Sequence, residues 1–443
     1  MTIRHRIDDR AAFHALIDES VLAAVAAGIR TFAPLLRHLP SVYPIELLAS
    51  LDRMGRVGAI DPVVVQSVHR QASTRPSEPP EGRSLLPLPH PLDFEWRFTP
   101  AASRELLDAA CALTEPNGRI LLFGTPGVAV EALSLPISRP LSFLGEDNTV
   151  TRRLVALNSA TESPLSIAFC SAGLPRESAD AILLDPPWYI DFIRPMLAAA
   201  ATACRRDGVV LVSLPPRGTR PSAVVDREKV LSFATRLGLD LVEYRTLGIA
   251  YDAPFFEMNA LAAAGVFAPF QWRRGDLVIL RKTRTSARPA GAARKRRREW
   301  IETSVGRMRL FIEPGQIATG LSGLISHVPG DILPSVSRRD PRRRGAQVWT
   351  SGNRVFRTDN AELVLEAALA ASGAEMGPTD QPWLWDSVSE RDAIDRVGYE
   401  LETLAAKEAA EERGSPMSAV EWGMPWTSSS TNYYCRLPVT VSG

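Results

Sequence analysis

The chain has 443 residues, with 51 Lys and Arg against 50 Asp and Glu, which gives a formal net charge of +1 at pH 7. With 45% hydrophobic and 23% charged residues, the composition is typical of a soluble globular protein and excludes a disordered or fibrous chain. The near-zero net charge excludes attraction of nucleic acid or membrane by the molecule as a whole, so any such attraction must come from local clusters. This length exceeds one ordinary core, and we expect two or three domains.

Cysteine and histidine are sparse and scattered. The four cysteines have neither metal-ligand nor paired spacing, so we expect free buried thiols in a reducing cytoplasm and no metal site. The first residues lack the apolar region of a signal peptide. No uncharged apolar run is long enough to span a bilayer. These patterns predict a cytoplasmic protein that binds neither membrane nor metal, and they leave the oligomeric state open.

Residues 1–72 have a helical pattern. Apolar residues at helical spacing around 13–25 predict a first helix, and two short amphipathic helices are expected at 31–39 and 44–54, with Ser41 as a cap. Three short helices with tight connections fit a helix-turn-helix in which residues 53–58 begin a wing or turn. Many small helical modules share this pattern without touching DNA.

Residues 73–92 form a proline-rich linker, which cannot adopt regular structure. From 93 to 284 the chain alternates short apolar runs with amphipathic helices, the pattern of a mostly parallel sheet with crossover helices. The last of these strands is expected to pair antiparallel at the sheet edge. Seven strands are expected, at residues 119–123, 140–145, 165–169, 180–184, 208–214, 239–244 and 276–281.

A basic linker, residues 285–298, follows the sheet domain and belongs to an arginine-rich run without acidic residues that begins at Arg281. Residues 299–443 are expected to form an α+β domain for substrate recognition. Its predicted strands and helices lie at 307–312, 347–357, 360–371 and 388–413. The tail from Trp422 is rich in serine and aromatic residues, which predicts irregular structure.

Two features at the carboxyl ends of the early strands suit a nucleoside cofactor. The turn of Gly124, Thr125, Pro126 and Gly127 follows the first strand; its glycines allow close backbone approach, and the next helix offers free amides to a charged ligand. Glu146 and Asp147 end the second strand, where a carboxylate can accept both hydroxyls of a ribose. The alternatives are a simple connecting turn and a helix cap.

The strongest motif follows the fourth strand. Asp185, Pro186, Pro187 and Trp188, the Asp-Pro-Pro-Trp motif, come directly after an apolar run. Two prolines end the strand and stiffen the turn. This turn can aim the Asp185 carboxylate and the Pro186 carbonyl at one amino group, while Trp188 offers a flat face for a planar substrate. A plain strand-ending turn is the alternative.

The span from Gly124 to Lys282 resembles the class I S-adenosylmethionine (SAM)-dependent methyltransferases that act on amino groups, whose signature is Asp/Asn-Pro-Pro-aromatic. The resemblance implies a Rossmann-like seven-stranded sheet, SAM bound at the glycine turn, and a target nitrogen held by Asp185 and Pro186. With tryptophan as the aromatic residue, the motif is similar to that of adenine N6-methyltransferases of DNA or RNA. The turn departs from the usual Gly-Xaa-Gly-Xaa-Gly.

A second resemblance is to the branched-chain polyamine synthases. It rests on the helical N-terminal region, the proline linker, the run from His90 to Asp93, and the Asp-Pro-Pro sequence. That family carries an acidic loop after the first strand, whereas residues 124–127 of this chain contain no acid. The departure argues against a polyamine substrate.

Two arginine clusters, within 281–298 and 337–344, favour a phosphate backbone as partner. Residues 93–98, with Trp96 and Arg97, and residues 251–257 are further candidates for cofactor or substrate contacts, or alternatively for packing. We expect an N-methyltransferase acting on adenine N6 in nucleic acid. The alternatives are N-transfer to a protein or small amine, including aminopropyl transfer to a polyamine, and a non-catalytic binding module.

Overall fold

The computed structural model describes residues 3–39, 41–75, 85–161, 165–170, 175–285, 298–315, 320–372, 388–414 and 436–439. The chain divides into two compact units. Unit 1 consists of Met1–Arg75, Trp96–Ala253 and Gly265–Ala293, and unit 2 consists of Pro76–Glu95, Pro254–Ala264 and Arg294–Gly443.

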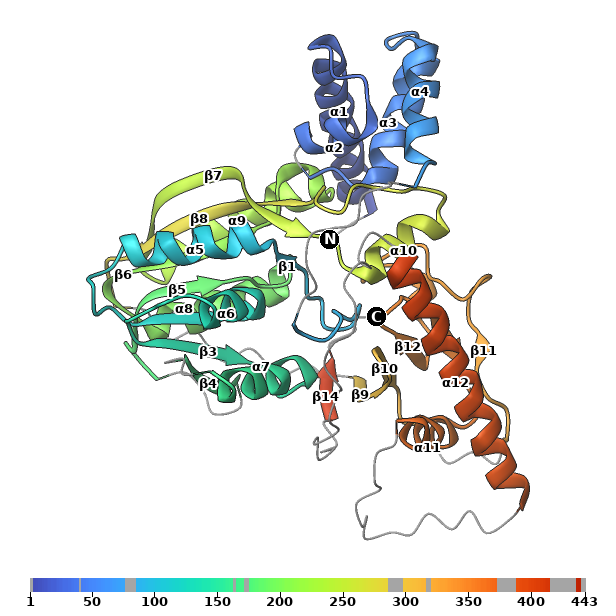
Figure 1. Cartoon of the computed structure of the whole chain (residues 1–443). Helices are drawn as coiled ribbons and strands as arrows, with labels where there is room; N and C mark the ends of the chain where they lie inside the picture. The colour runs from blue at the N-terminus through green and yellow to red at the C-terminus, as the bar shows by residue number, and fades with distance from the viewer. Residues whose placement is uncertain are drawn as a thin grey trace. The chain divides into compact units, whose positions relative to one another are not determined.

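Unit 1 is built on an eight-stranded sheet with the strand order β1-β7-β8-β6-β5-β2-β3-β4 (Figure 1). Its strands are β1 (Arg97–Phe98), β2 (Ile120–Phe123), β3 (Leu141–Gly145), β4 (Leu165–Phe169), β5 (Ala179–Leu184), β6 (Cys204–Leu214), β7 (Leu239–Asp252) and β8 (Arg274–Lys282). Strands β2 to β6 pair in parallel.

The position of β8 corrects the expected topology. It lies between β6 and β7 and is antiparallel to both, so it is not an edge strand. The short β1 pairs with β7 and adds an eighth strand at the edge. Sequence patterns do not show this insertion, because a buried strand has the same apolar run in either position.

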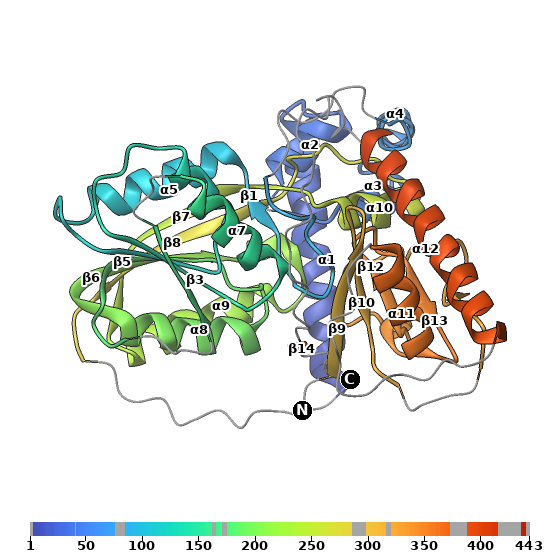
Figure 2. The ribbon, with the colours of Figure 1, turned by 60° about the horizontal axis from the view of Figure 1, so that its bottom comes forward.

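Helices cover both faces of this sheet, as Figure 2 shows. On one face lie α5 (Pro100–Ala112), α6 (Pro126–Leu133) and α7 (Thr149–Ser159), and on the other lie α8 (Ile190–Ala203) and α9 (Ala223–Arg236). Local chemistry starts two of these helices: the side chain of Thr99 accepts from the Ala102 amide, and Asn148 accepts from the Thr151 amide. Unit 1 therefore has the Rossmann-like α/β fold.

This strand order places a topological switch between β2 and β5. From β2 the chain moves outward to β3 and β4, then returns to β5 on the other side of β2. Ligands of open α/β sheets bind at the carboxyl edge of the strands near such a switch. The turns that follow β2 and β5 carry Gly124 and Asp185, so the fold brings the two sequence motifs to one edge.

The N-terminal region contains four described helices where three were expected: α1 (Ile3–Ala26), α2 (Phe32–His38), α3 (Pro44–Arg56) and α4 (Pro62–Ala72). Of the wing or turn expected to begin at 53–58, the structure shows the turn: residues 57–58 form a turn between α3 and α4, and the described residues 41–75 contain no strand. Ser41 was wrong as a cap, because it has a φ of +58° and its hydroxyl donates to the Arg274 carbonyl at 2.7 Å. Ser41 instead joins the helices to β8.

Unit 2 contains a six-stranded antiparallel sheet in the order β11-β13-β12-β10-β9-β14. The strands are β9 (Arg298–Val305), β10 (Met308–Ile312), β11 (Ile325–Ser326), β12 (Val348–Thr350), β13 (Val355–Arg357) and β14 (Arg436–Val439). The irregular structure expected from Trp422 onward is wrong for β14, which pairs with β9.

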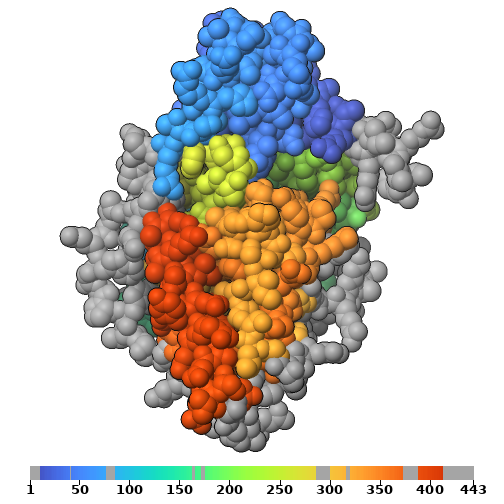
Figure 3. Space-filling model, turned by 90° about the vertical axis from the view of Figure 1, so that its right-hand side faces the viewer, coloured from blue at the N-terminus to red at the C-terminus, as the bar shows by residue number. Residues whose placement is uncertain are grey.

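The described residues of unit 2 include three α-helices: α10 (Phe255–Ala263), α11 (Ala361–Ala371) and α12 (Val388–Gly414). Helix α12, red in Figure 3, lies lengthwise beside the orange residues of the same unit. Apolar residues of the sheet, α11 and α12 form one core, which includes Leu310, Val364 and Val397.

Part of the expected linker packs into unit 2. Leu86, Leu88 and Leu92 are buried. The Arg309 guanidinium lies 2.6 Å from the Asp93 carboxylate and also binds Glu302, and all three side chains are almost fully buried. A buried charge is stable only when it is paired, so these bonds tie residues 85–93 to the sheet of unit 2. Residues 76–84 lie outside the described part of the chain.

Candidate functional site

The Asp-Pro-Pro-Trp motif lies at the carboxyl end of β5, beside the glycine turn. The Asp185 amide donates to the Phe123 carbonyl at 3.4 Å. Gly124 has a φ of +66°, and a Cβ built on it would lie 3.5 Å from the Asp185 carbonyl oxygen and 3.3 Å from Met196 Cε. Glycine suits this position because it adopts the left-handed conformation without strain and admits the neighbouring backbone.

A chain of hydrogen bonds links Trp188 to Asp185. The Trp188 indole Nε1 lies 3.3 Å from Ser213 Oγ, and Ser213 Oγ lies 2.5 Å from the Tyr251 hydroxyl. The Tyr251 hydroxyl donates to Asp185 Oδ1 at 2.7 Å. The four side chains come from three elements, namely the turn after β5, strand β6 and strand β7. We call this set the hydrogen-bond relay.

Burial keeps the Tyr251 hydroxyl protonated. Tyr251 is 1% exposed, and this burial, with the nearby negative charge of Asp185, raises its pKa well above the usual 10. The ring of Tyr251 meets the Trp188 ring edge-on, with the centroids 5.3 Å apart. Tyr251 therefore contacts both Asp185 and Trp188, the first by a hydrogen bond and the second by ring packing.

Gly275 on β8 makes room for this arrangement. A Cβ at Gly275 would lie 2.8 Å from Ser213 Oγ, 2.9 Å from Trp188 Cζ2 and 3.0 Å from Tyr251 Cε2. These separations are too short for any real side chain. Gly275 is thus a steric requirement of the relay, although its role does not follow from an unusual φ.

Arg273 lies among three indole rings. Its guanidinium carbon is 4.8 Å from the centre of the Trp272 ring, 5.2 Å from Trp96 and 5.6 Å from Trp188. Such cation–π contacts gain strength when the cation is shielded from water, and Arg273 is only 8% exposed. The motif's tryptophan is therefore backed by a positive charge.

The expected segment 93–98 is split between the two units after Glu95. The Trp96 ring contacts the Arg273 guanidinium, which also contacts Trp188. Arg97 lies in β1, opposite Asp252 in the strand register, while Asp93 is bound in unit 2. The bonds of Asp93 agree with the packing alternative for the start of this segment, and a contact of residues 93–98 with cofactor or substrate stays a prediction.

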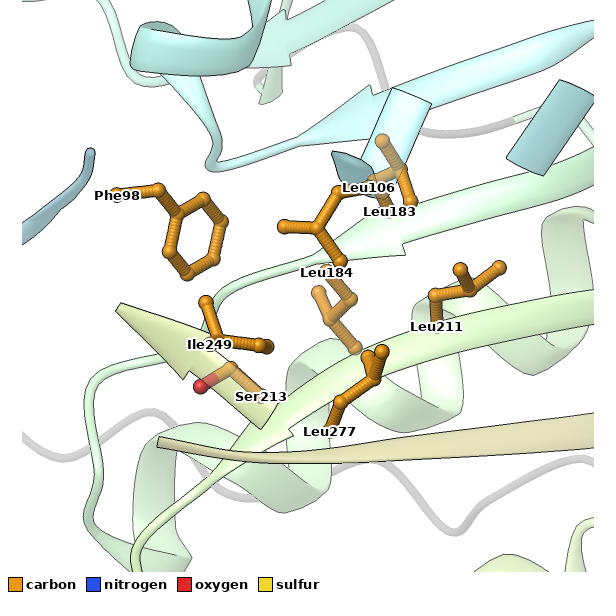
Figure 4. A pocket seen from close by; sticks show the side chains of 8 residues that line it. All are labelled: Phe98, Leu106, Leu183, Leu184, Leu211, Ser213, Ile249 and Leu277. Atoms are coloured by element: carbon orange, nitrogen blue, oxygen red, sulfur yellow. The ribbon is translucent and has the colours of Figure 1, made fainter. Parts of the chain in front are cut away.

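An apolar void lies behind the relay, lined by Phe98, Leu106, Leu183, Leu184, Leu211, Ser213, Ile249 and Leu277 (Figure 4). The Ser213 hydroxyl is the single polar side-chain group among the eight lining residues. The void is too narrow for a water molecule, so it is part of the packed interior and not a ligand pocket.

The glycine turn offers a buried hydroxyl without a partner among the described residues. Thr125, at the N-cap position of α6, makes no capping bond, and its Oγ1 is buried and unbonded. Ser103 Oγ is likewise buried and unbonded, and it lies 3.7 Å from a Cβ built at Gly127. A buried polar atom that lacks a partner calls for an explanation such as a ligand or water.

The two acids after β3 differ in their surroundings. Asp147 pairs with Arg152 at 3.0 Å, and Asn148, not either acid, caps α7. The Glu146 backbone carbonyl accepts from the Asn148 amide, but the carboxylate of this exposed residue has no hydrogen bond or ion pair to any described residue. Glu146 is therefore the acid that can turn to a ligand without breaking a bond.

The arginine clusters are partly reassigned. In the cluster 337–344, Arg343 is 2% exposed and stacks on Trp349 with 4.3 Å between guanidinium carbon and ring centre, so its assignment to a surface cluster was wrong. Arg339 and Arg344 are exposed, and the exposed Arg342 pairs with Asp340. Of the run 281–298, residues 286–297 lie outside the described ranges.

Sequence reasoning missed several residues of this edge. Ser213 could have been found as a polar residue inside the apolar run of β6, and Arg217 as a cation directly after the Pro215-Pro216 end of that strand. Gly275 gave no signal beyond being a glycine at a strand start. Tyr251 was included only in the broad segment 251–257.

Within the described ranges, no group of three or more His, Cys, Asp or Glu side chains is placed to hold a metal ion. The described cysteines Cys111, Cys170 and Cys204 are free thiols. None of the described helices has the length and apolar character needed to cross a membrane.

No protein-family model and no curated protein matches the sequence. Among solved structures, the branched-chain polyamine synthase from Thermus thermophilus, bound to N4-aminopropylspermidine and 5'-methylthioadenosine, is 16% identical with a TM-score of 0.45, over 64% of this chain and 92% of that chain. A mutein of that synthase is 16% identical with a TM-score of 0.44, over 62% of this chain and 90% of that chain. A TehB-like SAM-dependent methyltransferase from Corynebacterium glutamicum is 14% identical with a TM-score of 0.27, over 42% of this chain and 88% of that chain. Such identities leave the reaction and substrate open.

Proposed function

We propose that this chain is a SAM-dependent N-methyltransferase whose target is an exocyclic amino group, with adenine N6 in DNA or RNA as the substrate. The observation that carries the proposal is the position of Asp185 beside Gly124 at the topological switch, with its carboxylate held by Tyr251. A weakly nucleophilic nitrogen must be held in the correct orientation to react, and a carboxylate fixed beside the cofactor turn can hold it.

The residues around the glycine turn fit SAM. The buried Thr125 hydroxyl without a bonded partner and the left-handed Gly124 provide a polar cradle with close backbone access. The start of α6 presents backbone amides suited to a carboxylate, and the exposed Glu146 follows β3, where a carboxylate can accept ribose hydroxyls. When bound, SAM supplies a methyl group attached to a positively charged sulfur.

The chain's own contribution is orientation. Asp185 and the Pro186 carbonyl accept the two N–H bonds of the amino group, which turns the nitrogen lone pair toward the methyl carbon. SAM would supply the methyl group for the new N–C bond, and the electron pair of the broken S–C bond would stay on sulfur. The nitrogen then releases one proton to solvent, so no dedicated base is needed. Positioning and electrostatics supply most of the rate.

Three features favour nucleic acid as the substrate. Trp188 suits stacking of a base. The exposed Arg217 follows β6 at the same sheet edge as Asp185, and Arg339 and Arg344 are exposed in unit 2. Phosphates attract such cations in a salt-dependent manner. A polycationic amine suits the site less well, since Arg273 backs Trp188 and residues 124–127 lack an acid.

The test is incubation of the purified chain with tritiated SAM and, separately, single-stranded and duplex oligonucleotides, polyamines, and a protein lysate. We expect label in adenine of the oligonucleotides, lost in Asp185→Ala and retained in Asp108→Asn, an exposed acid on α5. Label in the polyamine or protein fraction alone would identify a small amine or a protein as the substrate in place of nucleic acid. Absence of label together with absence of SAM binding by calorimetry would overturn the proposal.

A further inference from the structure

We infer that Tyr251 and Ser213 are positioning residues, which hold Asp185 and Trp188 in one fixed relation before substrate binds. This inference rests on the proposed function, since it assigns these residues a role in the same site. Neither residue belongs to the Asp-Pro-Pro-Trp motif. Ser213 lies on β6, 28 positions after Asp185, and Tyr251 lies on β7, 66 positions after it.

The direction of each bond in the relay follows from its two ends. The indole N–H of Trp188 can only donate, and an ionised Asp185 can only accept. Ser213 therefore accepts from Trp188 and donates to Tyr251, which in turn donates to Asp185. All three protons point toward the carboxylate, and successive bonds of one direction strengthen each other in a buried setting.

The relay leaves the carboxylate able to bind substrate. A carboxylate has about four acceptor positions on its two oxygens, and the bond from Tyr251 uses one of them. What the bond removes is rotation of the Asp185 side chain. Since Tyr251 is 1% exposed and packed edge-on against Trp188, it cannot follow a rotating carboxylate without disturbing the ring as well.

The same bonds fix the plane of the Trp188 ring. One edge of the ring donates to Ser213, and its Cζ2 lies against the space that only Gly275 leaves. The stacking surface and the amino-group acceptor are thus set relative to each other by two residues outside the motif. Misplacement of a reacting group by about 1 Å can cost about 100-fold in rate, so we expect loss of the relay to act on kcat.

The experiment compares Tyr251→Phe and Ser213→Ala with the wild-type full-length chain, and Tyr244→Phe is the matched control. Tyr244 lies on the same strand and bonds to Asp276, not to the relay. We expect Tyr251→Phe to lower kcat by about 10- to 100-fold while the KM for SAM stays unchanged. The acid limb of its pH profile should move to higher pH, because a hydroxyl that donates to an ionised carboxylate stabilises that form. If Tyr251 were merely structural, its replacement would neither lower kcat at an unchanged KM for SAM nor shift the pH profile in this way.

A second readout needs no substrate. The chain has nine tryptophans, and Trp188→Phe identifies the Nε1–H signal of Trp188 in the 15N NMR spectrum of indole-labelled protein. That signal should shift in Ser213→Ala and in Tyr251→Phe and stay in place in Tyr244→Phe. If the wild type transfers no methyl group, the proposed function fails while the indole signal still reports on the relay. If Tyr251→Phe keeps the wild-type kcat and pH profile, or the signal does not move, the inference is overturned.

Discussion

The guanidinium carbon of Arg273 lies 5.6 Å from the centre of the Trp188 ring. The ring expected to receive the substrate thus has the chain's own cation as a neighbour, and Trp96 and Trp272 flank the same cation. A positive charge so well shielded from water acts over a longer range than an exposed one. It should select against cationic acceptors and in favour of anionic ones.

Replacement of Arg273 by Met should therefore change which substrates are accepted. We expect the KM for an adenine-containing oligonucleotide to rise by about 10-fold, which is the loss of one contact of about 1.4 kcal/mol, and the KM for a polyamine to fall or stay unchanged. The measurement is steady-state methyl transfer to each acceptor. Arg274→Met, at the exposed neighbouring position, is the control; equal effects of both variants would contradict selection by Arg273.

Gly275→Ala should disturb the site by crowding. Its Cβ would come within 3.0 Å of Ser213, Trp188 and Tyr251, and overpacking of a buried position costs about 1–3 kcal/mol. We expect a lower Tm and a loss of transfer at least as large as that of Tyr251→Phe. Gly398→Ala on helix α12 is the matched control, because its Cβ would lie 3.7 Å from the Ala367 carbonyl oxygen. That variant should be neutral or slightly more stable, since alanine favours a helix by about 0.5–1 kcal/mol over glycine. Full activity of Gly275→Ala would show that the relay tolerates displacement.

The sheet of unit 1 could be predicted in its parts because apolar runs and their stops lie close together in sequence. Leu165–Phe169 was predicted at its observed bounds, and Ile120–Phe123 ends at Gly124 as expected. The place of β8 between β6 and β7 depends on pairing across the sheet, which leaves no local pattern. The same holds for β14, whose sequence has no alternation but whose backbone pairs with β9.

The candidate site was predictable only where one motif holds its residues together. The Asp-Pro-Pro-Trp motif carries its own turn chemistry, so it could be located from four consecutive residues. The relay joins residues of one turn and two strands, and Ser213 and Tyr251 are ordinary in their own segments. Arg343 shows that a local pattern can also mislead. A run of arginines predicts solvent exposure, yet the Arg343 guanidinium is buried where it stacks on the Trp349 ring.

Glu408 should make the stability of unit 2 depend on pH. Burial raises the pKa of this carboxyl from 4.5 to about 7, against the opposing bond from the Thr350 hydroxyl and the charge of Arg354. The folded state thus binds the proton more tightly than the unfolded state, so stability is full below about pH 4.5 and falls as the pH rises toward 7. The slope is at most about 1.4 kcal/mol per pH unit.

Glu408→Gln should remove this dependence. Urea unfolding at pH 5 and pH 7.5 gives the free energy of unfolding, and we expect the variant to lose less stability than the wild type between the two values. The exposed Glu402 on the same helix supplies the control variant Glu402→Gln, which should keep the wild-type pH dependence. Identical pH profiles for Glu408→Gln and the wild type would mean that Glu408 is ionised in the folded protein throughout this range.

Replacement of the two acids after β3, Glu146 and Asp147, should have different effects on cofactor binding. The Glu146 carboxylate has no bond to a described residue, whereas the Asp147 carboxylate already pairs with Arg152. An acid that must break an ion pair before it binds ribose gains less from the ligand, because the gain is reduced by the bond it gives up. We expect Glu146→Gln to weaken SAM binding by about 10-fold or more, the loss of charge-assisted hydrogen bonds of about 1.5–3 kcal/mol, and Asp147→Asn to change it by less than about 3-fold. Isothermal titration calorimetry gives both values, and a larger loss in Asp147→Asn would reverse the assignment and place the ribose at the second acid.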